Sequence, residues 1–389
     1  MDKMSRHVDS QISSHFGNSR QIVLLLGARQ VGKTTLVKRL FPDAQYLLLD
    51  NNPVRKNFET YDINSYKQFI DPHRKVVIID EIQLLPDPGR AAKIIYDQMP
   101  DVQLVIMGSS ALNIKNRTSE SLAGRKIDYH LYPLTFYEYL YQTGTEDKLD
   151  GDLLKKVVLN RIQPTAHSFD LRATIGRVLT YGLSPYLVNH PSDSAYLSEL
   201  AYSSIYKDIL ALDLIENRAV AEDLLKLLAY QIGNLINYSE LASKLGVDAR
   251  TVKRYISIFE QSFIIFRLPP FTSKRRNEIG KAPKIYFYDL GLRNAIIGDF
   301  SDPFLRRDFG AMFENFIISE VLKHNSYSKA GYGLAFWRTL QGSEVDLVLH
   351  KANEVVACEI KTSQGRVSTA FGNRYPKATQ IVITLENFY

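Results

Sequence analysis

The chain has 389 residues with a formal net charge of +6, and 45% of them are hydrophobic and 23% charged. This composition excludes a disordered or fibrous protein, and the length predicts two or three globular domains. The single cysteine, Cys358, excludes a disulfide within the chain and favours a reducing compartment. No apolar run approaches the roughly 18–20 residues of a membrane-spanning helix, and the polar start Met1–His7 does not have the pattern of a secretory signal. We therefore expect a cytoplasmic protein without a membrane partner.

The first predicted element is a buried strand that runs directly into a phosphate-binding loop. Ile22–Leu26 is wholly aliphatic, and Gly27–Thr34 fits the pattern G-x-x-x-x-G-K-[ST] without a mismatch. In such a loop, backbone N–H groups and the start of the next helix face the phosphates. Lys33 would reach the β- and γ-phosphates of ATP, and the Thr34 hydroxyl would bind Mg²⁺. The predicted nucleotide-binding residues of this loop are Gly27, Gln30, Val31, Gly32, Lys33, Thr34 and Thr35.

Three further β-rich runs follow, separated by helix-patterned stretches: Tyr46–Asp50, Val76–Asp80 and Val102–Met107. This alternation predicts a parallel sheet buried on both faces. Acids at the carboxyl end of a parallel strand lie in the crevice where such sheets bind ligands. We therefore interpret Asp80 as a ligand of nucleotide-bound Mg²⁺ and Glu81 as the residue that orients the attacking water. A solvated turn after the strand is the alternative.

Two further residues are candidates for catalysis. Ser109 follows the fourth strand and could contact the γ-phosphate or the attacking water, although an ordinary Gly-Ser turn is the alternative. Arg125 precedes another β-like stretch, Lys126–Leu131, and lies far along the chain from the phosphate loop. Such an arginine could neutralise transition-state charge on the ATP of a neighbouring copy, or could form only a surface salt bridge. The first role requires a homo-oligomeric ring or another face-to-tail oligomer.

Several blocks of the chain together resemble one group of prokaryotic proteins. The blocks are Gly27–Thr35, Ile79–Gln83, Gly108–Ser110, Leu122–Arg125 and Tyr132–Tyr139. The chain resembles AAA+-type ATPases (AAA_14-like) that carry a C-terminal domain of unknown function, DUF4143. This resemblance covers nearly the whole chain, and it implies an ATP-binding and ATP-hydrolysing core over residues 1–135.

Residues 136–218 are helix-patterned, and we interpret them as a helical lid or connector. The aromatic residues at its start have the spacing of packed helices: Phe136, Tyr137, Tyr139 and Tyr141. We therefore place these side chains in a core and assign no chemistry to them.

Residues 219–290 have the pattern of a winged-helix domain. Three predicted helices precede two predicted strands: Ala221–Ile232, Tyr238–Gly246, Ala249–Gln261, Phe263–Leu268 and Lys284–Tyr288. A turn containing glycine between the second and third helices is typical of a helix-turn-helix, and Asp248 is a suitable N-cap for the third helix. Basic residues on that helix and between the strands could contact DNA phosphates: Arg250, Lys253, Arg254, Lys274, Arg275 and Arg276. Since winged helices also serve as packing modules, a structural role is the alternative.

The last segment, residues 291–389, contains two runs that alternate strictly, Glu344–Leu349 and Glu354–Lys361. An antiparallel pair around a turn at Ala352–Asn353 places Asp346 opposite Glu359. Facing carboxylates repel each other unless a cation or proton lies between them, and oxygen ligands favour Mg²⁺ or Mn²⁺. The other face of the pair is predicted to be apolar: Val345, Leu347, Leu349, Val356, Cys358 and Ile360.

With Glu314 on a preceding helix, these residues resemble the PD-(D/E)xK nuclease superfamily, although valine replaces the proline before Asp346. The resemblance implies that Glu314, Asp346 and Glu359 bind the metal. It also implies that Lys361 is the catalytic lysine, which positions or polarises water. A surface salt-bridge ladder that includes Glu344 and Lys361 is the alternative.

The sequence therefore predicts an α/β protein in four parts: a P-loop AAA+-like ATPase with a parallel sheet, a helical connector, a winged helix and a PD-(D/E)xK nuclease-like α/β domain. The predicted function is ATP binding and hydrolysis coupled to nucleic-acid binding, with a C-terminal domain that grips nucleic acid or cuts it with Mg²⁺ or Mn²⁺. The alternative is a regulatory or signalling ATPase whose winged helix only packs and whose nuclease fold is catalytically silent.

Overall fold

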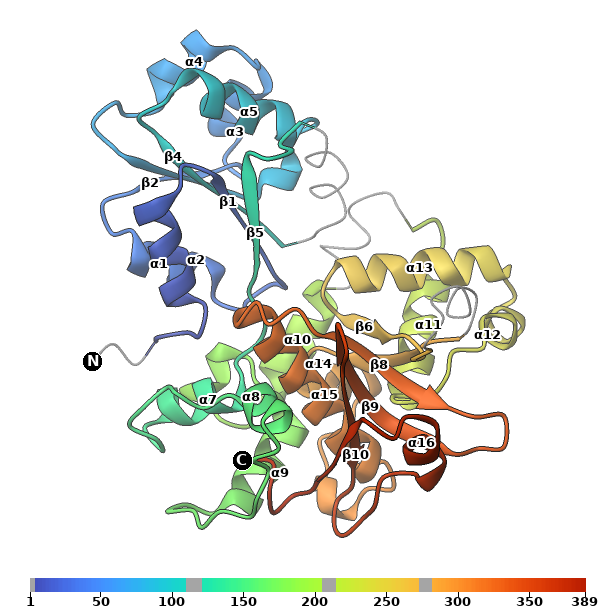
Figure 1. The fold of residues 1–389 in the computed structure, drawn as a ribbon. Coiled ribbons are helices and arrows are strands. Elements are labelled where there is room, and N and C mark those ends of the chain that lie inside the picture. The colour runs from blue at the N-terminus through green and yellow to red at the C-terminus, as the bar shows by residue number, and fades with distance from the viewer. Residues whose placement is uncertain (1–3, 110–120, 205–214, 273–281) are drawn as a thin grey trace. The chain divides into compact units, whose positions relative to one another are not determined.

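The computed structural model describes residues 4–109, 121–204, 215–272 and 282–389 (Figure 1). The chain divides into two compact units, one of Met1–Tyr132 with Gln261–Phe263 and one of Pro133–Glu260 with Ile264–Tyr389. No helix in the described ranges combines the length and apolar character that crossing a membrane requires. The domain boundaries predicted at residues 135, 218 and 290 stay predictions.

The first unit is built on a five-stranded parallel sheet in the order β2-β3-β4-β1-β5. Its strands are β1 (Ile22–Leu26), β2 (Gln45–Leu48), β3 (Val76–Asp80), β4 (Gln103–Gly108) and β5 (Lys126–His130). The predicted parallel α/β sheet is therefore confirmed. Because β4 lies between β1 and β3, the carboxyl ends of these three strands meet at one edge. At this edge the phosphate loop follows β1, Asp80 is the last residue of β3, and Ser109 follows β4.

Helices cover both faces of this sheet, with α1 and α2 on one face and α3, α4 and α5 on the other (Figure 1). Their bounds are α1 (Asp9–Asn18), α2 (Lys33–Leu40), α3 (Asn52–Glu59), α4 (Ile63–Phe69), the 3₁₀ turn η1 (Ile82–Leu84) and α5 (Pro88–Gln98). Side-chain caps define two of the starts, because Asp62 and Asp87 accept hydrogen bonds from the first turns of α4 and α5. Strand β1, between β4 and β5, is fully buried between these layers, as its aliphatic sequence predicts.

The second unit begins with helices that also start at capping residues. Thr135 and Glu138 form a reciprocal capping box at the start of α7, and Asp152, Asp170 and Asp193 cap the next three helices. The helices up to residue 261 are α7 (Phe136–Thr143), α8 (Leu153–Val158), α9 (Leu171–Tyr181), the 3₁₀ turn η2 (Pro185–Val188), α10 (Ser194–Ser203), α11 (Arg218–Tyr230), α12 (Tyr238–Leu245) and α13 (Ala249–Gln261). Phe136 and Tyr139 are buried in the core as predicted, whereas Tyr137 lines a cavity.

The three helices and two strands predicted between 221 and 288 are all present as elements. Strands β6 (Ile265–Leu268) and β7 (Lys284–Phe287) pair antiparallel, with Ile265 opposite Phe287. Asp248 accepts a hydrogen bond of 2.6 Å from the backbone N–H of Thr251, in keeping with its predicted capping role. The basic residues Lys274, Arg275 and Arg276 lie outside the described residues.

A four-stranded sheet in the order β11-β10-β9-β8 ends the second unit. The remaining elements are α14 (Leu290–Ile297), the 3₁₀ turn η6 (Pro303–Leu305), α15 (Phe309–Tyr327), β8 (Gly333–Arg338), β9 (Glu344–Lys351), β10 (Glu354–Ile360), α16 (Thr369–Arg374) and β11 (Thr379–Ile383). β9 pairs antiparallel with β8 and β10, and β10 pairs parallel with β11. The observed pair Cys358–Leu347 confirms the predicted register of the β9–β10 hairpin.

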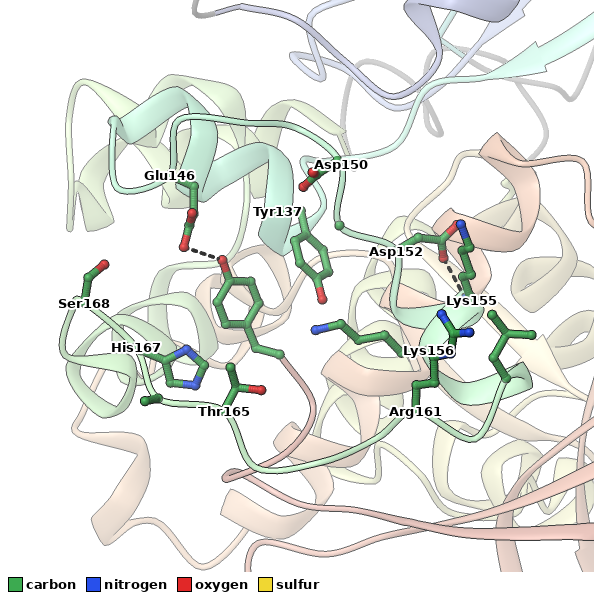
Figure 2. Close-up of a pocket in the computed structure, with 14 residues that line it drawn as sticks. Tyr137, Glu146, Asp150, Asp152, Lys155, Lys156, Arg161, Thr165, His167 and Ser168 are labelled. Carbon is green, nitrogen blue, oxygen red and sulfur yellow. Dashed lines mark hydrogen bonds between the residues drawn. The ribbon is translucent and has the colours of Figure 1, made fainter.

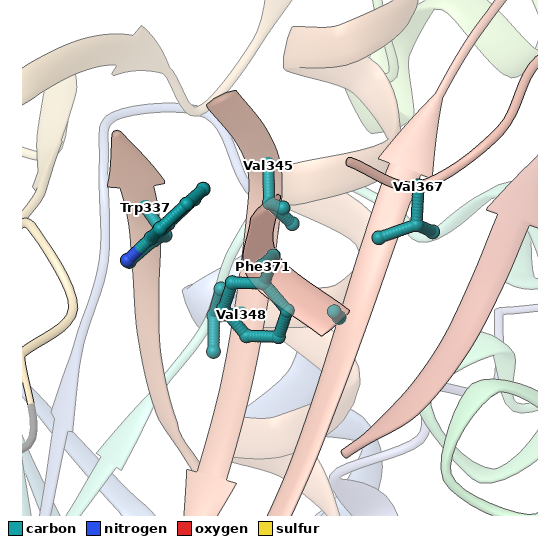
Figure 3. Close-up of a cluster of buried hydrophobic side chains, with 6 residues drawn as sticks. Trp337, Val345, Val348, Val367 and Phe371 are labelled. Atoms are coloured by element: carbon teal, nitrogen blue, oxygen red, sulfur yellow. The ribbon is translucent and has the colours of Figure 1, made fainter. Parts of the chain in front are cut away.

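The prediction of one apolar and one polar face was wrong at Val345. A register shift between Ala335 and Trp337 interrupts the β8–β9 pairing, and such an irregularity breaks the alternation of side chains along a strand. Val345 consequently packs in a cluster on the face opposite to the predicted one (Figure 3): Trp337, Val345, Val348, Ala357, Val367 and Phe371. Because Leu347 and Cys358 are also fully buried, both faces of the sheet are largely apolar.

Candidate functional site

The backbone of the phosphate loop depends on glycine at two positions. A Cβ atom at Gly27 would lie 2.1 Å from the carbonyl oxygen of Leu131, so a larger residue would displace the backbone just after β5. Gly32 has φ 91° at the start of α2, a conformation that side chains disfavour. Lys33 is buried, and its ammonium donates to two carbonyl oxygens of the loop, both at 2.8 Å. The loop therefore already holds this cation against its own backbone.

Thr34 and Asp80 lie side by side at the carboxyl edge of the sheet. Thr34 Oγ1 donates to Asp80 Oδ2 at 3.1 Å, and the Tyr46 hydroxyl donates to the same oxygen. The other oxygen of Asp80 accepts the backbone N–H of Glu81 at 2.9 Å. Burial and the Asp80 carboxylate raise the pKa of Tyr46, which therefore stays a neutral donor. A hydroxyl beside a carboxylate is a donor set that suits Mg²⁺.

Glu81 and Ser109 are brought together by a residue that was not predicted, Gln83. The Gln83 amide donates to Glu81 Oε2 and, at 3.3 Å, to Ser109 Oγ. Ser109 Oγ itself lies 3.5 Å from Glu81 Oε2. Glu81 has φ 58°, a left-handed conformation that is uncommon for residues other than glycine and is often found at functional sites. Gln83 lies two residues after Glu81 in the sequence, and this short separation is the signal that could have identified it as a site residue.

Arg6 and Tyr46 are the other residues of this site that sequence reasoning missed. The buried Arg6 guanidinium donates to the carbonyl oxygens of Val31 at 3.0 Å and Tyr132 at 2.8 Å, and thereby ties the phosphate loop to the segment after β5. No local pattern marks Arg6. Tyr46 could have been found only from the strand order, since β2 lies beside β3.

Arg125 lies away from this carboxyl edge. It directly precedes β5, and its carbonyl accepts the backbone N–H of Ile22 at the start of β1, whereas the phosphate loop follows the end of β1. Its guanidinium forms a salt bridge of 3.1 Å with Asp97, and both side chains are about one-third exposed. Within one chain, Arg125 is therefore at the opposite end of the strands from the phosphate loop.

In the second unit, Asp346 and Glu359 meet around Lys361. The Lys361 ammonium lies 2.7 Å from Glu359 Oε1 and 3.2 Å from Asp346 Oδ2. Asp346 Oδ2 also accepts the backbone N–H of Ile360 at 2.8 Å. Glu359 Oε2 is buried and has no hydrogen-bond partner among the described residues. Burial and Asp346 raise the pKa of Glu359.

Glu314 is held by a second lysine, Lys284, which was not predicted to belong to the site. Glu314 Oε1 accepts the Tyr286 hydroxyl at 2.5 Å and lies 3.2 Å from the Lys284 ammonium. Lys284 is only 3% exposed and also pairs with Glu344 at 2.5 Å. The alternation of β7 places Lys284 and Tyr286 on the same face, but their acidic partners are remote in sequence.

These contacts give the carboxylates a different arrangement from the predicted metal site. Within the described ranges, no three His, Cys, Asp or Glu side chains come close enough together to hold a metal ion. Asp346 and Glu359 share Lys361, whereas Glu314 is bound to Lys284 and Tyr286. The residues as arranged do not fit a three-carboxylate metal centre, because lysine ammonium groups supply the positive charge.

Three of the six basic residues predicted for DNA contact lie on the exposed side of α13. Val252 and Tyr255 are buried, whereas Arg250, Lys253 and Arg254 are exposed. Arg254 forms a salt bridge of 3.0 Å with the exposed Glu216. The Lys253 ammonium lies 5.2 Å from the ring centre of Tyr238.

Comparison with known families identifies a domain near each end of the chain. The AAA domain family matches residues 19–140, and the domain of unknown function DUF4143 matches residues 309–387. This is an AAA-domain protein with a C-terminal DUF4143 domain. A further domain of unknown function, DUF8612, matches residues 172–302 between them. The predicted resemblance is confirmed, and the AAA domain supports ATP binding and hydrolysis by the first unit.

Two relatives that align over most of this chain are described as uncharacterized proteins. A protein of Methanocaldococcus jannaschii is 24% identical over 91% of this chain and 78% of its own length. A protein of Mycobacterium tuberculosis is 26% identical over 87% of this chain and 70% of its own. The alignment with a solved RuvB variant of Thermotoga maritima covers 67% of this chain and 89% of the RuvB chain, with 16% identity. The TM-score of this alignment is 0.33, which is too low to support an inference about function.

Proposed function

We propose that the first unit of this AAA-domain protein binds ATP together with Mg²⁺ and hydrolyses the nucleotide. The observation that carries the proposal is the meeting of Lys33, Thr34, Asp80, Glu81 and Ser109 at one edge of the parallel sheet. The AAA-domain match over residues 19–140 supports it. An anion is favoured there because backbone N–H groups, the start of α2 and a buried ammonium converge.

Each side chain has a role that follows from its contacts. Lys33 would neutralise phosphate charge, and Thr34 and Asp80 would hold Mg²⁺ through their adjacent oxygens. Bound Mg²⁺ neutralises negative charge on the phosphate oxygens. Glu81 would orient the attacking water, while Gln83 and Ser109 hold the Glu81 carboxylate in place by hydrogen bonds. Arg6 fixes the backbone of the loop on which this geometry depends.

Nucleotide binding is tested with Lys33→Ala and a fluorescent ATP analogue in the presence of Mg²⁺. We expect at least about a tenfold loss of affinity, because a buried charge-assisted contact with phosphate is removed. Lys93→Ala, which removes an exposed lysine of α5 in the same unit, is the control and should bind as the parent does. Equal binding by parent and Lys33→Ala would overturn the proposed site.

We further propose that Arg125 acts on the nucleotide of a neighbouring copy in a ring. Its place at the start of β5, at the far end of the strands from its own phosphate loop, favours action in trans over action in cis. If so, mixing Arg125→Ala with Glu81→Gln should restore part of the phosphate release that each variant lacks alone. If mixed oligomers show no restoration, the proposal is wrong, and the role of Arg125 is its surface salt bridge with Asp97.

For the second unit we propose nucleic-acid contact through Arg250, Lys253 and Arg254 of α13. Their exposure on one side of a helix that follows a tight turn supports this assignment. Reversal of the three charges to Glu should weaken duplex DNA binding and reduce its salt dependence, because phosphate contacts release counterions. DNA binding that is unchanged by the reversal would support the regulatory alternative with a packing-only helix-turn-helix.

Cleavage of nucleic acid is the second candidate for this unit, and its supporting observation is the orphaned, buried oxygen Glu359 Oε2 beside Asp346 and Lys361. The neutralisation of these acids by lysines favours a silent fold over a nuclease. Incubation of plasmid DNA with Mg²⁺ or Mn²⁺ separates the two. Products that disappear in Lys361→Ala would establish cleavage, and the absence of products from the parent would establish the silent fold.

A further inference from the structure

A cavity of about 660 Å³ lies in the second unit, away from the carboxylate–lysine residues described above (Figure 2). Its walls come from the start of α7, the loop that leads into α8, α8 itself and residues 161–168, and Tyr389 completes them. The wall carries both signs of charge, because the lining includes basic and acidic side chains: Lys155, Lys156, Arg161, His167, Glu146, Asp150 and Asp152. The volume is that of a small-molecule site.

Lys156 is the central cation of this cavity. Its ammonium lies 5.6 Å from the ring centre of Tyr137 and 5.4 Å from that of Tyr389. Among the described residues, the Lys156 ammonium forms neither a salt bridge nor a hydrogen bond, although the Lys156 backbone does. An ammonium has three hydrogen-bond donors, and contacts with ring faces do not replace oxygen acceptors. Lys156 therefore has capacity for an anionic partner.

Two more polar groups beside Lys156 lack partners. The Tyr137 hydroxyl and His167 Nε2 are buried and make no hydrogen bond within the described part of the chain. In Figure 2 the Tyr137 hydroxyl and the Lys156 ammonium point into the same space. Buried polar groups without partners are uncommon in native proteins and point to an absent ligand or water.

Two of the three acidic side chains that line the cavity, in contrast, are already engaged. Glu146 Oε1 accepts the Tyr389 hydroxyl at 2.8 Å, and Asp152 Oδ1 accepts the backbone N–H of Lys155 at 3.0 Å as the N-cap of α8. Asp152 also lies 3.6 Å from His324 Nδ1. The buried groups of the cavity without partners among the described residues thus favour an anion, whereas Glu146 and Asp152 are committed to the protein.

We propose that this cavity binds a small molecule in which an aromatic ring carries a carboxylate or a phosphate group. The anion pairs with Lys156 and accepts the Tyr137 hydroxyl, and the ring packs beside Tyr389 and His167, whose ring centres are 5.2 Å apart. Burial lowers the pKa of Lys156, and burial together with Lys156 lowers the pKa of His167. His167 therefore stays neutral at pH 7 and serves as a hydrogen-bonding side chain, while the ammonium provides the charge.

The proposal is tested by calorimetric titration of the full chain with benzoate, phenyl phosphate and neutral benzamide. We expect at least one of the two anions to bind about tenfold more tightly than benzamide, since a charge-assisted contact is lost with the amide. The stronger of benzoate and phenyl phosphate identifies which anionic group the cavity accepts. Absence of binding by both anions, or equal binding of benzamide, would overturn the proposal.

Variants locate the binding. Lys156→Met should lose about tenfold in affinity for the preferred anion, and Tyr137→Phe, which removes only a hydroxyl, should lose a few-fold. Lys148→Met removes a nearby exposed lysine that does not line the cavity and should bind as the parent does. Circular dichroism confirms folding, and Tyr137→Phe remains informative if Lys156→Met is unfolded. Binding that survives both changes, or that is lost in Lys33→Ala instead, would place the anion elsewhere and contradict the proposal.

Discussion

The carboxylates at the edge of the first sheet and those in the second unit are neutralised in different ways. Asp80 is contacted by two hydroxyl groups and a backbone N–H, all of which are neutral donors. Asp346 and Glu359 instead share the Lys361 ammonium, and Glu314 is paired with Lys284. Neutral donors orient a carboxylate and leave its charge for a cation, whereas a lysine compensates that charge. The comparison therefore predicts metal-assisted chemistry at Asp80 and a structural role for the lysine-bound acids.

The largest effect is expected at Glu81. Glu81→Gln keeps the side-chain shape but removes the negative charge that orients water, so phosphate release should fall by about a thousandfold while ATP binding persists. Gln98→Glu at the end of α5 is the control for a charge change elsewhere in the same unit and should leave turnover unchanged. If Glu81→Gln hydrolyses ATP at the parental rate, the carboxylates of the first unit are no more catalytic than the lysine-bound carboxylates of the second unit, and the comparison fails.

The second effect concerns stability. Lys284→Met leaves Glu314 and Glu344 without their shared buried cation, and removal of one partner of a buried ion pair costs about 3 kcal/mol of unfolding free energy. Urea denaturation measures the change. The double variant Lys284→Met, Glu314→Gln should recover part of the loss, because one uncompensated charge is then absent. A single variant as stable as the parent would show that the acids do not need this lysine.

Lys361→Met should have a smaller effect than Lys284→Met. The Lys361 side chain is 43% exposed, compared with 4% for Lys284, and exposed ion pairs contribute at most about 1 kcal/mol. The same urea series provides the measurement. A loss as large as that of Lys284→Met would mean that Asp346 and Glu359 depend on Lys361 as strongly as a buried pair does.

An effect that depends on pH is expected at Asp308, whose charge is also compensated by basic side chains. Burial opposes its ionisation, but Arg306 and Arg293, each 2.7 Å away, lower the pKa of Asp308 to about 2. Because this folded-state pKa lies below the usual value near 4, the pair stabilises the fold above about pH 4, and the contribution is lost as the pH falls towards 2. Asp308→Asn should therefore be less stable than the parent at pH 7, with the gap closing between about pH 4 and 2. A gap that is constant with pH would contradict this assignment.

The first unit was predictable because its signals are local. The aliphatic runs Ile22–Leu26 and Val76–Asp80 match β1 and β3 residue for residue, and each leads directly into polar site residues. The register of the β9–β10 hairpin was likewise predictable, since a two-residue turn and strict alternation leave few pairings. Tyr46 was missed because its contact with Asp80 depends on which strand lies beside β3.

The second site was harder to predict because its partners are remote in sequence. Lys284 lies on β7, yet it neutralises Glu314 on α15 and Glu344 on β9. The irregularity that moves Val345 to the other face has no marker in the alternating run of β9. Tyr137 has the spacing of a core aromatic, and only the fold shows that its hydroxyl reaches a cavity.

The most direct test of the contrast between the two sets of carboxylates is Mg²⁺-dependent phosphate release by the parent, Asp80→Asn and Asp346→Asn. We predict that the parent hydrolyses ATP, that Asp80→Asn loses most of this activity at all Mg²⁺ concentrations, and that Asp346→Asn retains it. A parent that neither binds ATP nor releases phosphate with Mg²⁺, or an Asp80→Asn variant as active as the parent, would contradict the account.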